Sequence, residues 1–81
     1  MEDILVFVGT KRKDFSVKMR VIFFKKGNKI LCQNWNYLTK SWADASAKFL
    51  LNRKKYAGIY DYLRSELTGF DWEEREISEV F

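Results

Sequence analysis

Two stretches rich in β-branched and aromatic residues flank the dipeptide Gly27-Asn28, and this arrangement constrains the fold more than any other feature of the sequence. The stretches cover residues 15–25 and 29–38. Gly and Asn readily adopt the positive φ angles of two-residue hairpin turns, so the pattern predicts an antiparallel hairpin. A turn at Gly27-Asn28 pairs Lys26 with Lys29 and sets the register outward from that pair.

A short run near the start of the chain predicts a further strand. Residues 3–8 read Asp-Ile-Leu-Val-Phe-Val, which is apolar at consecutive positions. A strand that is apolar on both faces is typical of the middle of a sheet.

The middle of the chain predicts two helices. Ser41-Trp42-Ala43-Asp44 fits the Ser-x-x-acid capping pattern, so the first helix is expected to begin at Ser41. Its apolar face would carry Trp42, Ala45, Phe49 and Leu50. The second helix would end near Glu66 and be closed by Gly69, unless the two form one long helix. Its apolar positions are Tyr56, Ile59, Tyr60, Leu63 and Leu67.

Residues 70–81 suit either a helix or a strand. Asp71-x-x-Glu74 can cap a helix, whereas Arg75 to Val80 read as a half-exposed strand. We favour the strand, because a sheet with a doubly apolar strand needs neighbours on both of its sides. The expected order is therefore βββααβ, an α+β fold in which two helices pack on one face of a small antiparallel sheet. Residues 1–81 would form one domain.

The composition argues against an enzyme and against a metal site. The chain has no histidine and a single cysteine, Cys32, so it lacks an imidazole base and the paired ligands of a zinc site. No glycine-rich phosphate loop or other cofactor motif appears. A lone cysteine fits a reducing cytoplasm, and Glu2 and Asp3 stand where a signal peptide would be basic. No apolar run approaches the ~20 residues of a membrane span.

Charge is segregated along the chain. Thirteen of the 15 basic residues lie in residues 10–55, against two acidic residues, so this part carries +11. Residues 1–9 carry −2 and residues 56–81 carry −5. A basic body beside an acidic tail generates a directional field and suggests a polyanionic partner.

The predicted hairpin places basic and aromatic residues together on one face. In the register above, Arg20 lies opposite Trp35 and Lys18 opposite Tyr37, while Cys32 lies on the core side. Rings on which bases stack, beside cations that follow phosphates, are typical of single-strand nucleic-acid platforms. The same pairs also occur simply because they stabilise sheets, and one β-bulge would exchange the faces.

Three further basic clusters lie at predicted loops, turns or helix ends, where long side chains can reach phosphates or can simply be solvated. They are Lys11-Arg12-Lys13, Lys25-Lys26-Lys29 and Arg53-Lys54-Lys55. The candidate nucleic-acid-binding residues are Lys11, Arg12, Lys13, Lys18, Arg20, Lys25, Lys26, Lys29, Trp35, Tyr37, Arg53, Lys54 and Lys55. The acidic tail is either a solvated edge or a contact for a basic protein. Its candidate protein-contact residues are Glu73, Glu74, Glu76 and Glu79.

In whole-chain character the sequence resembles small phage-encoded counter-defence proteins, such as anti-CRISPR proteins and antagonists of toxin ribonucleases. The shared features are a short chain without proline, histidine or catalytic residues, which ends in an acidic segment after a lysine-rich hairpin. The +11 stretch departs from the acidic nucleic-acid mimics common among anti-CRISPR proteins. The resemblance implies stoichiometric inhibition by binding, in the cytoplasm of a host cell.

Three functions remain in competition. The first is a non-enzymatic module that binds RNA, DNA or a nucleoprotein through its basic body. The second is a protein inhibitor that docks on a host nuclease, toxin or CRISPR complex through its aromatic and acidic surface. The third is a structural subunit whose charge serves solubility. We favour the first.

Overall fold

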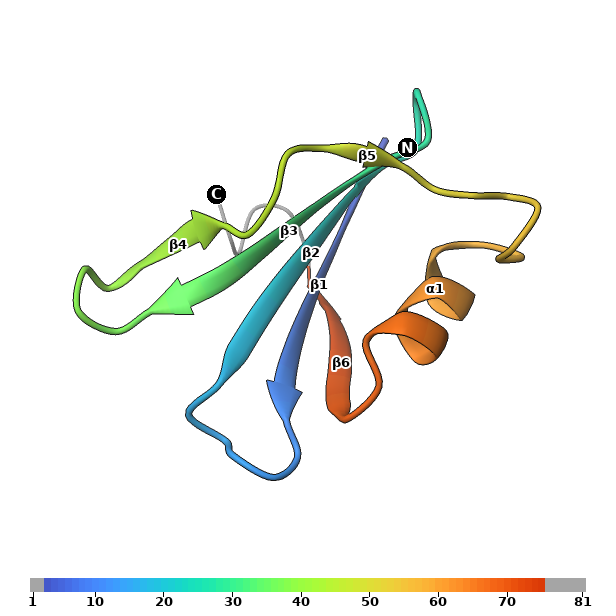
Figure 1. The fold of residues 1–81 in the computed structure, drawn as a ribbon. Helices are drawn as coiled ribbons and strands as arrows, with labels where there is room; N and C mark the ends of the chain where they lie inside the picture. Colours follow the sequence, from blue (N-terminus) through green and yellow to red (C-terminus); the bar gives the residue numbers. More distant parts are fainter. Residues whose placement is uncertain (1–2, 76–81) are drawn as a thin grey trace.

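The chain folds into an antiparallel sheet with a short helix against one of its faces (Figure 1). The computed structural model describes residues 3–75. The strand order is β4-β3-β2-β1-β6, and the short β5 pairs with the start of β3. The elements are β1 Ile4–Lys11, β2 Lys18–Phe24, β3 Lys29–Asn36, β4 Ser41–Asp44, β5 Phe49–Leu50, α1 Ile59–Glu66 and β6 Phe70–Arg75.

The expected α+β fold with two helices is wrong. Residues 3–75 form six strands and one helix of eight residues, so the architecture is mainly a β-sheet. No helix in this range is long and apolar enough to cross a membrane. The expected strand at residues 3–8 is present as β1, which lies between β2 and β6 as a central strand should.

The helix expected to begin at Ser41 is replaced by the edge strand β4. Trp42 pairs with Trp35 of β3, and their ring centroids lie 5.2 Å apart in an edge-to-face arrangement. The Asp44 carboxylate accepts a hydrogen bond from the Gln33 amide at 2.8 Å instead of capping a helix. The capping pattern is local, but these cross-strand contacts are tertiary, and they determine the outcome.

The second expected helix is present as α1 and ends at Glu66, as the spacing predicts. It begins at Ile59, because Gly58 is extended and the Asp61 carboxylate accepts the Ala57 N–H at 3.1 Å. Tyr56 precedes the helix but still contributes a buried ring to the core.

The predicted hairpin forms, with a register two residues away from the expected one. Its turn contains four residues, 25–28, in which Gly27 and Asn28 both have positive φ. Asn28 N–H donates to the Lys25 carbonyl at 3.2 Å and closes the turn. A shift of two residues leaves every side chain on its expected face but changes its partner, so Arg20 lies opposite Gln33 rather than Trp35.

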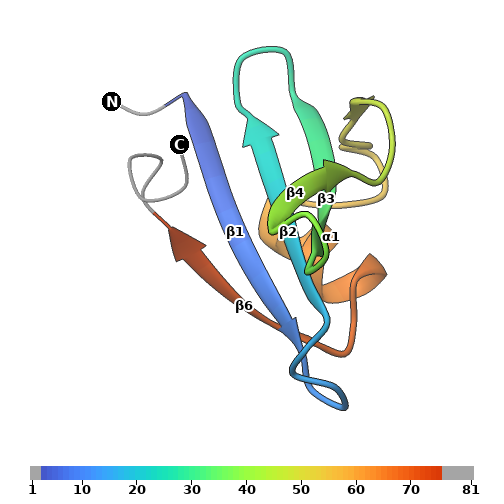
Figure 2. The same ribbon diagram turned by 90° about the vertical axis from the view of Figure 1, so that its left-hand side faces the viewer.

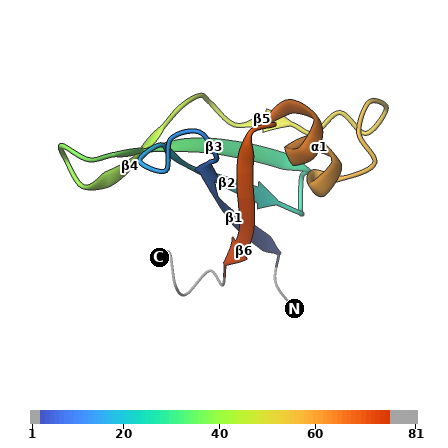
Figure 3. The ribbon, with the colours of Figure 1, turned by 90° about the horizontal axis from the view of Figure 1, so that it is seen from below.

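The core lies between α1 and one face of the sheet. Phe7 from β1, Val21 from β2 and Ile30 from β3 pack against Ile59 and Leu63 of α1. In Figure 3 the helix lies beside β6, to its right. Cys32 is 6% exposed within the same cluster, which confirms the core position that the sequence predicts.

The sheet is strongly twisted, so β6 and β4 run in very different directions at its two ends (Figure 2). β6 pairs antiparallel with β1, so residues Phe70–Arg75, which include the possible helix cap at Asp71, form a strand as favoured for this segment. The rest of the expected strand, from residue 76 on, lies outside the described residues.

Candidate nucleic-acid interface

The turn of the β2–β3 hairpin forms hydrogen bonds with residues 51–53, which lie more than twenty residues further along the chain. Asn28 Nδ2 donates to the Leu51 carbonyl at 2.8 Å, and the Leu51 N–H donates back to the Asn28 carbonyl at 2.9 Å. The Arg53 Nε donates to Asn28 Oδ1 at 3.1 Å. Because Asn28 has a positive φ of 55°, its side chain and carbonyl both reach this segment.

These contacts bring two of the predicted basic clusters together. We call the result the hairpin-end surface, and it consists of Lys25, Lys26, Lys29, Arg53 and Lys54. All five side chains are exposed, and none forms an ion pair with a carboxylate of residues 3–75. Asp3 lies beside the turn, where its carbonyl accepts the Lys25 N–H at 2.8 Å.

Lys48 and Asn28 belong to the same end of the molecule and were missed by the sequence analysis. Lys48 Nζ lies 4.5 Å from the ring centroid of Phe24, next to the hairpin turn. Lys48 belongs to no basic cluster and lies inside the helix expected from Ser41, so no role was predicted for it. Asn28 was assigned only to the turn, although its amide joins the two clusters.

Lys55 points away from the hairpin-end surface, although it follows Lys54 directly. Its Nζ lies 3.8 Å from the Glu66 carboxylate of α1 and 5.4 Å from the Tyr56 ring centroid. A hydrogen bond with Tyr56, followed by the charge of Glu66, raises the pKa of Lys55. This lysine therefore already has an anionic partner within the chain.

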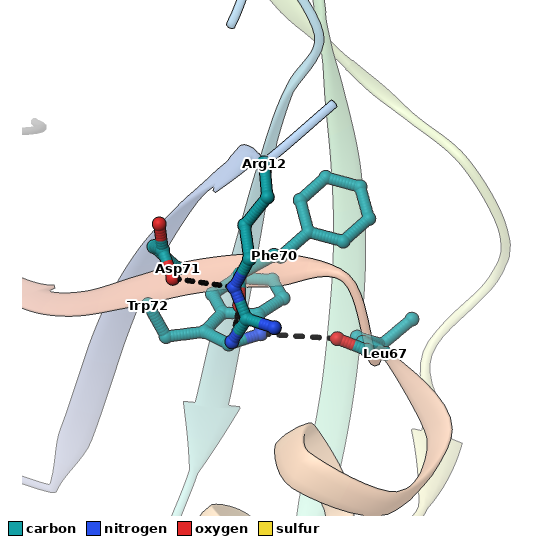
Figure 4. A network of polar contacts seen from close by, with 5 residues as sticks. All are labelled: Arg12, Leu67, Phe70, Asp71 and Trp72. Atoms are coloured by element: carbon teal, nitrogen blue, oxygen red, sulfur yellow. Dashed lines mark hydrogen bonds and ion pairs between the residues drawn. The ribbon is translucent and has the colours of Figure 1, made fainter. Parts of the chain in front are cut away.

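The cluster of Lys11, Arg12 and Lys13 lies at the opposite end of the sheet. β1 runs from beside the hairpin turn to Lys11, and its eight residues span roughly 23 Å. Lys18 lies next to this cluster, because Thr10 pairs with Lys18. Arg12 Nε forms an ion pair with Asp71 Oδ1 at 2.7 Å, as Figure 4 shows. The predicted basic body is therefore divided between two ends of the molecule.

Arg20 does not present its charge to solvent as the platform hypothesis requires. It is 5% exposed, and its Nε donates to Gln33 Oε1 at 2.7 Å. The guanidinium carbon lies 4.7 Å from the ring centroid of Trp42. Burial lowers the pKa of Arg20, while the Asp44 carboxylate acts in the opposite direction. The Arg20–Gln33–Asp44 chain of contacts links β2, β3 and β4.

The predicted aromatic partners of Arg20 and Lys18, which are Trp35 and Tyr37, belong to a cluster at the far end of β3. Trp35 packs edge-to-face against Trp42 at 5.2 Å and against Tyr37 at 6.1 Å between centroids. Trp35 and Trp42 are half-buried, whereas Tyr37 is 53% exposed. Trp42, which the sequence assigned to packing alone, is thus a member of this cluster.

The acidic residues of β6 do not share a surface. Glu74 lies opposite Phe7 on the helix-facing side and accepts a hydrogen bond from the Tyr60 hydroxyl. Glu73 lies on the other side and pairs with Arg75 at 2.5 Å. Glu76 and Glu79 lie outside the described residues.

Within residues 3–75, no group of three or more His, Cys, Asp or Glu side chains is arranged to hold a metal ion. The fold and its basic end define a small antiparallel β-protein with a cationic surface built from two separate segments. Comparison with protein-family models, curated proteins and solved structures found no match.

Proposed function

We propose that this chain is a non-enzymatic basic protein that binds nucleic acid, RNA or DNA, alone or within a nucleoprotein, through the hairpin-end surface. The observation that supports the proposal most is the pair of contacts from the Asn28 side chain to Leu51 and Arg53. They hold five exposed cations from two segments on one end of the molecule. Cations grouped in this way can contact successive phosphates of a nucleic acid, and each contact releases counterions from the phosphate backbone.

The proposed setting is a cytoplasm, where the nucleic acid is accessible. The buried thiol of Cys32, whose pKa is raised by burial, suits a reducing compartment.

The experiment is a fluorescence-anisotropy titration of short single-stranded RNA, single-stranded DNA and duplex DNA. The test variant K25E/K26E/K54E reverses three charges in turn and loop positions of the hairpin-end surface. The matched control K11E/K13E/K18E reverses three exposed lysines at the opposite end of the sheet. Both variants change the net charge equally, so they separate a site from a general electrostatic field.

We expect the hairpin-end variant to bind nucleic acid at least about tenfold more weakly than the wild type does. The control variant should lose much less affinity. An equal loss in both variants would show that the overall charge, and no particular surface, attracts the nucleic acid. Unchanged binding in the hairpin-end variant would rule out the proposed site.

A second candidate function is the docking of the β3–β4 hairpin on a protein such as a host nuclease, toxin or CRISPR complex. The observation that favours it is an exposed apolar tip: Leu38 is 96% exposed and stands beside Tyr37. Exposed aromatic and apolar side chains above a packed base are typical of interface anchors. Figure 1 shows this hairpin protruding from the sheet.

This candidate predicts a complex that survives nuclease treatment and moderate salt. The variant L38D should abolish such a complex, while K25E/K26E/K54E should retain it. If L38D retained the complex and K25E/K26E/K54E abolished it, the contact would lie at the hairpin-end surface and would involve nucleic acid.

A further inference from the structure

A cavity opens between α1 and β6, away from the hairpin-end surface. Its volume is about 280 Å³, and its wall includes Leu63 of α1, Leu67 directly after the helix, and Phe70 and Trp72 of β6. A second cavity of about 150 Å³ continues along the helix toward Tyr60 and shares Leu63 and Trp72 with the first. The two cavities therefore adjoin along α1, and we call the first of them the α1–β6 groove.

The aromatic wall of this groove is held in place from behind. The Trp72 indole N–H donates to the Leu67 carbonyl at 3.3 Å, which ties the ring to the end of the helix. The ring also lies directly on Gly9 of β1, where a Cβ would come within 2.8 Å of it. Phe70 stands beside Trp72 with 33° between the ring planes, and both rings are half-buried. A planar ligand can stack on such a wall.

Two arginines line the same cavity. Arg12 is oriented by its ion pair with Asp71 and by a hydrogen bond from Nη2 to the Phe70 carbonyl at 3.5 Å (Figure 4). Arg64, on the last turn of α1, is exposed and forms no ion pair with a carboxylate of residues 3–75. In this first cavity Asp71 compensates one of the two positive charges, so the balance there remains positive, whereas the Glu74 carboxylate lines the second cavity. Arginine donors in a fork suit the oxygen atoms of a phosphate.

We propose that this groove binds a single nucleotide, whose base lies against Phe70 and Trp72 and whose phosphate contacts Arg64 and Arg12. The cavity volume lies just below the range of about 300–1,000 Å³ for small-molecule sites, so the cavity encloses at most one nucleotide of any ligand. The nucleotide is either free or the terminal residue of a strand. The site does not depend on the hairpin-end surface.

The experiment is an NMR titration that follows the indole N–H signals of the three tryptophans. The ligands are adenosine and uridine monophosphates, adenosine, inorganic phosphate and a 5′-phosphorylated dinucleotide. We expect the monophosphates to shift the Trp72 signal in a saturable way and to leave those of Trp35 and Trp42 in place. Tighter binding of the dinucleotide would identify a strand end as the source, and equal binding would identify the free nucleotide.

The variant R64Q should bind the monophosphates about tenfold more weakly or worse, because a charged hydrogen-bond donor is lost. The matched control R53Q removes a guanidinium from the hairpin-end surface and should leave this titration unchanged. The variant K25E/K26E/K54E should also retain it, so failure of the nucleic-acid proposal and failure of this site are distinguishable.

Three results would overturn the nucleotide site. One is the absence of a saturable shift at Trp72. Another is an equal response to inorganic phosphate, which would show that no base is recognised. The third comes from a parallel titration with a short peptide that ends in phenylalanine: tighter binding of this peptide than of the monophosphates would assign the groove to a protein carboxyl terminus.

Discussion

At the scale of the residue, the contact between Gly9 and Trp72 explains why a glycine stands inside a buried strand. A hydrogen atom is the only substituent that lets the indole lie on the backbone of β1, since a Cβ would lie 2.8–2.9 Å from three of its ring atoms. Glycine inside a strand often marks such a close approach. The same contact fixes the wall of the α1–β6 groove.

The substitution Gly9→Ala should therefore displace Trp72 and lower the free energy of unfolding by about 1–3 kcal/mol, the usual cost of overpacking. Urea unfolding monitored by tryptophan fluorescence measures the change. Gly58→Ala is the matched control, because a Cβ there meets nothing within 4 Å. If both variants lose the same stability, the close contact with Trp72 has no special cost.

Tyr62 gives the second prediction at this scale. Burial raises its pKa to about 12 from an ordinary value of 10.0. Below pH 10.0 the hydroxyl is protonated in the folded and unfolded states alike, and its contribution to stability is complete. Between pH 10.0 and about 12 the unfolded chain loses this proton while folded Tyr62 keeps it, so the free energy of unfolding falls.

Urea unfolding at a series of pH values across this window tests the assignment. The variant Tyr62→Phe should show a shallower fall than the wild type. A fall remains in the variant, because burial also raises the pKa of Tyr56 and a hydrogen bond to Glu74 raises that of Tyr60. Identical slopes in variant and wild type would exclude Tyr62 as a source of the pH dependence.

At the scale of the element, Asn28 couples the hairpin turn to residues 51–53. The substitution Asn28→Gly keeps a residue suited to its positive φ of 55° and removes only the side-chain hydrogen bonds to Leu51 and Arg53. We expect a loss of about 1–2 kcal/mol in the free energy of unfolding. Binding of nucleic acid should weaken as well, since Arg53 loses its side-chain contact with the turn, although the backbone bond from Leu51 to residue 28 remains.

Chemical denaturation and anisotropy measure the two effects of Asn28→Gly. Asn52→Gly is a suitable comparison: it removes an amide that accepts hydrogen bonds from the N–H groups of Lys54 and Lys55 in its own loop. Full affinity in the Asn28 variant would mean that the two basic segments act separately.

The sequence predicted those elements whose signals are local. The hairpin turn, the central strand β1 and the end of the helix at Glu66 all follow from residues close together in the chain. The segment at Ser41 did not, because Trp42 and Asp44 are placed by β3, which no local pattern reveals. The register was wrong by two residues because the turn has four residues instead of two.

The candidate site shows the same division between local and tertiary information. The sequence identified all five cations of the hairpin-end surface, since lysine-rich turns and loops are visible as runs. It could not show that Asn28 joins them or that Lys55 is turned toward Glu66. It also left Arg20 on an open face, whereas the twisted sheet and Trp42 bury it.

At the scale of the whole molecule, the segregated charge of the sequence becomes two basic ends separated by the length of β1. The hairpin end holds five cations without a carboxylate partner in residues 3–75, while Asp71 already compensates Arg12 at the other end. A polyanion is therefore expected to reach the hairpin end first and to be held there. The salt dependence of binding reports how many of these cations take part.

Five cations that each neutralise one phosphate give a slope of log K against log salt of about −4.5 for duplex DNA and about −3.5 for a single strand. The neutral variant K25Q/K26Q/K54Q removes three of them, so its duplex slope should fall to about −1.8. The control K11Q/K13Q/K18Q lowers the net charge by the same amount and should keep the full slope, because its lysines lie at the other end of β1. Anisotropy titrations over a salt series measure all three slopes. If the control lost as much slope as the test variant, phosphates would contact both ends, and the nucleic acid would have to extend along the whole length of β1.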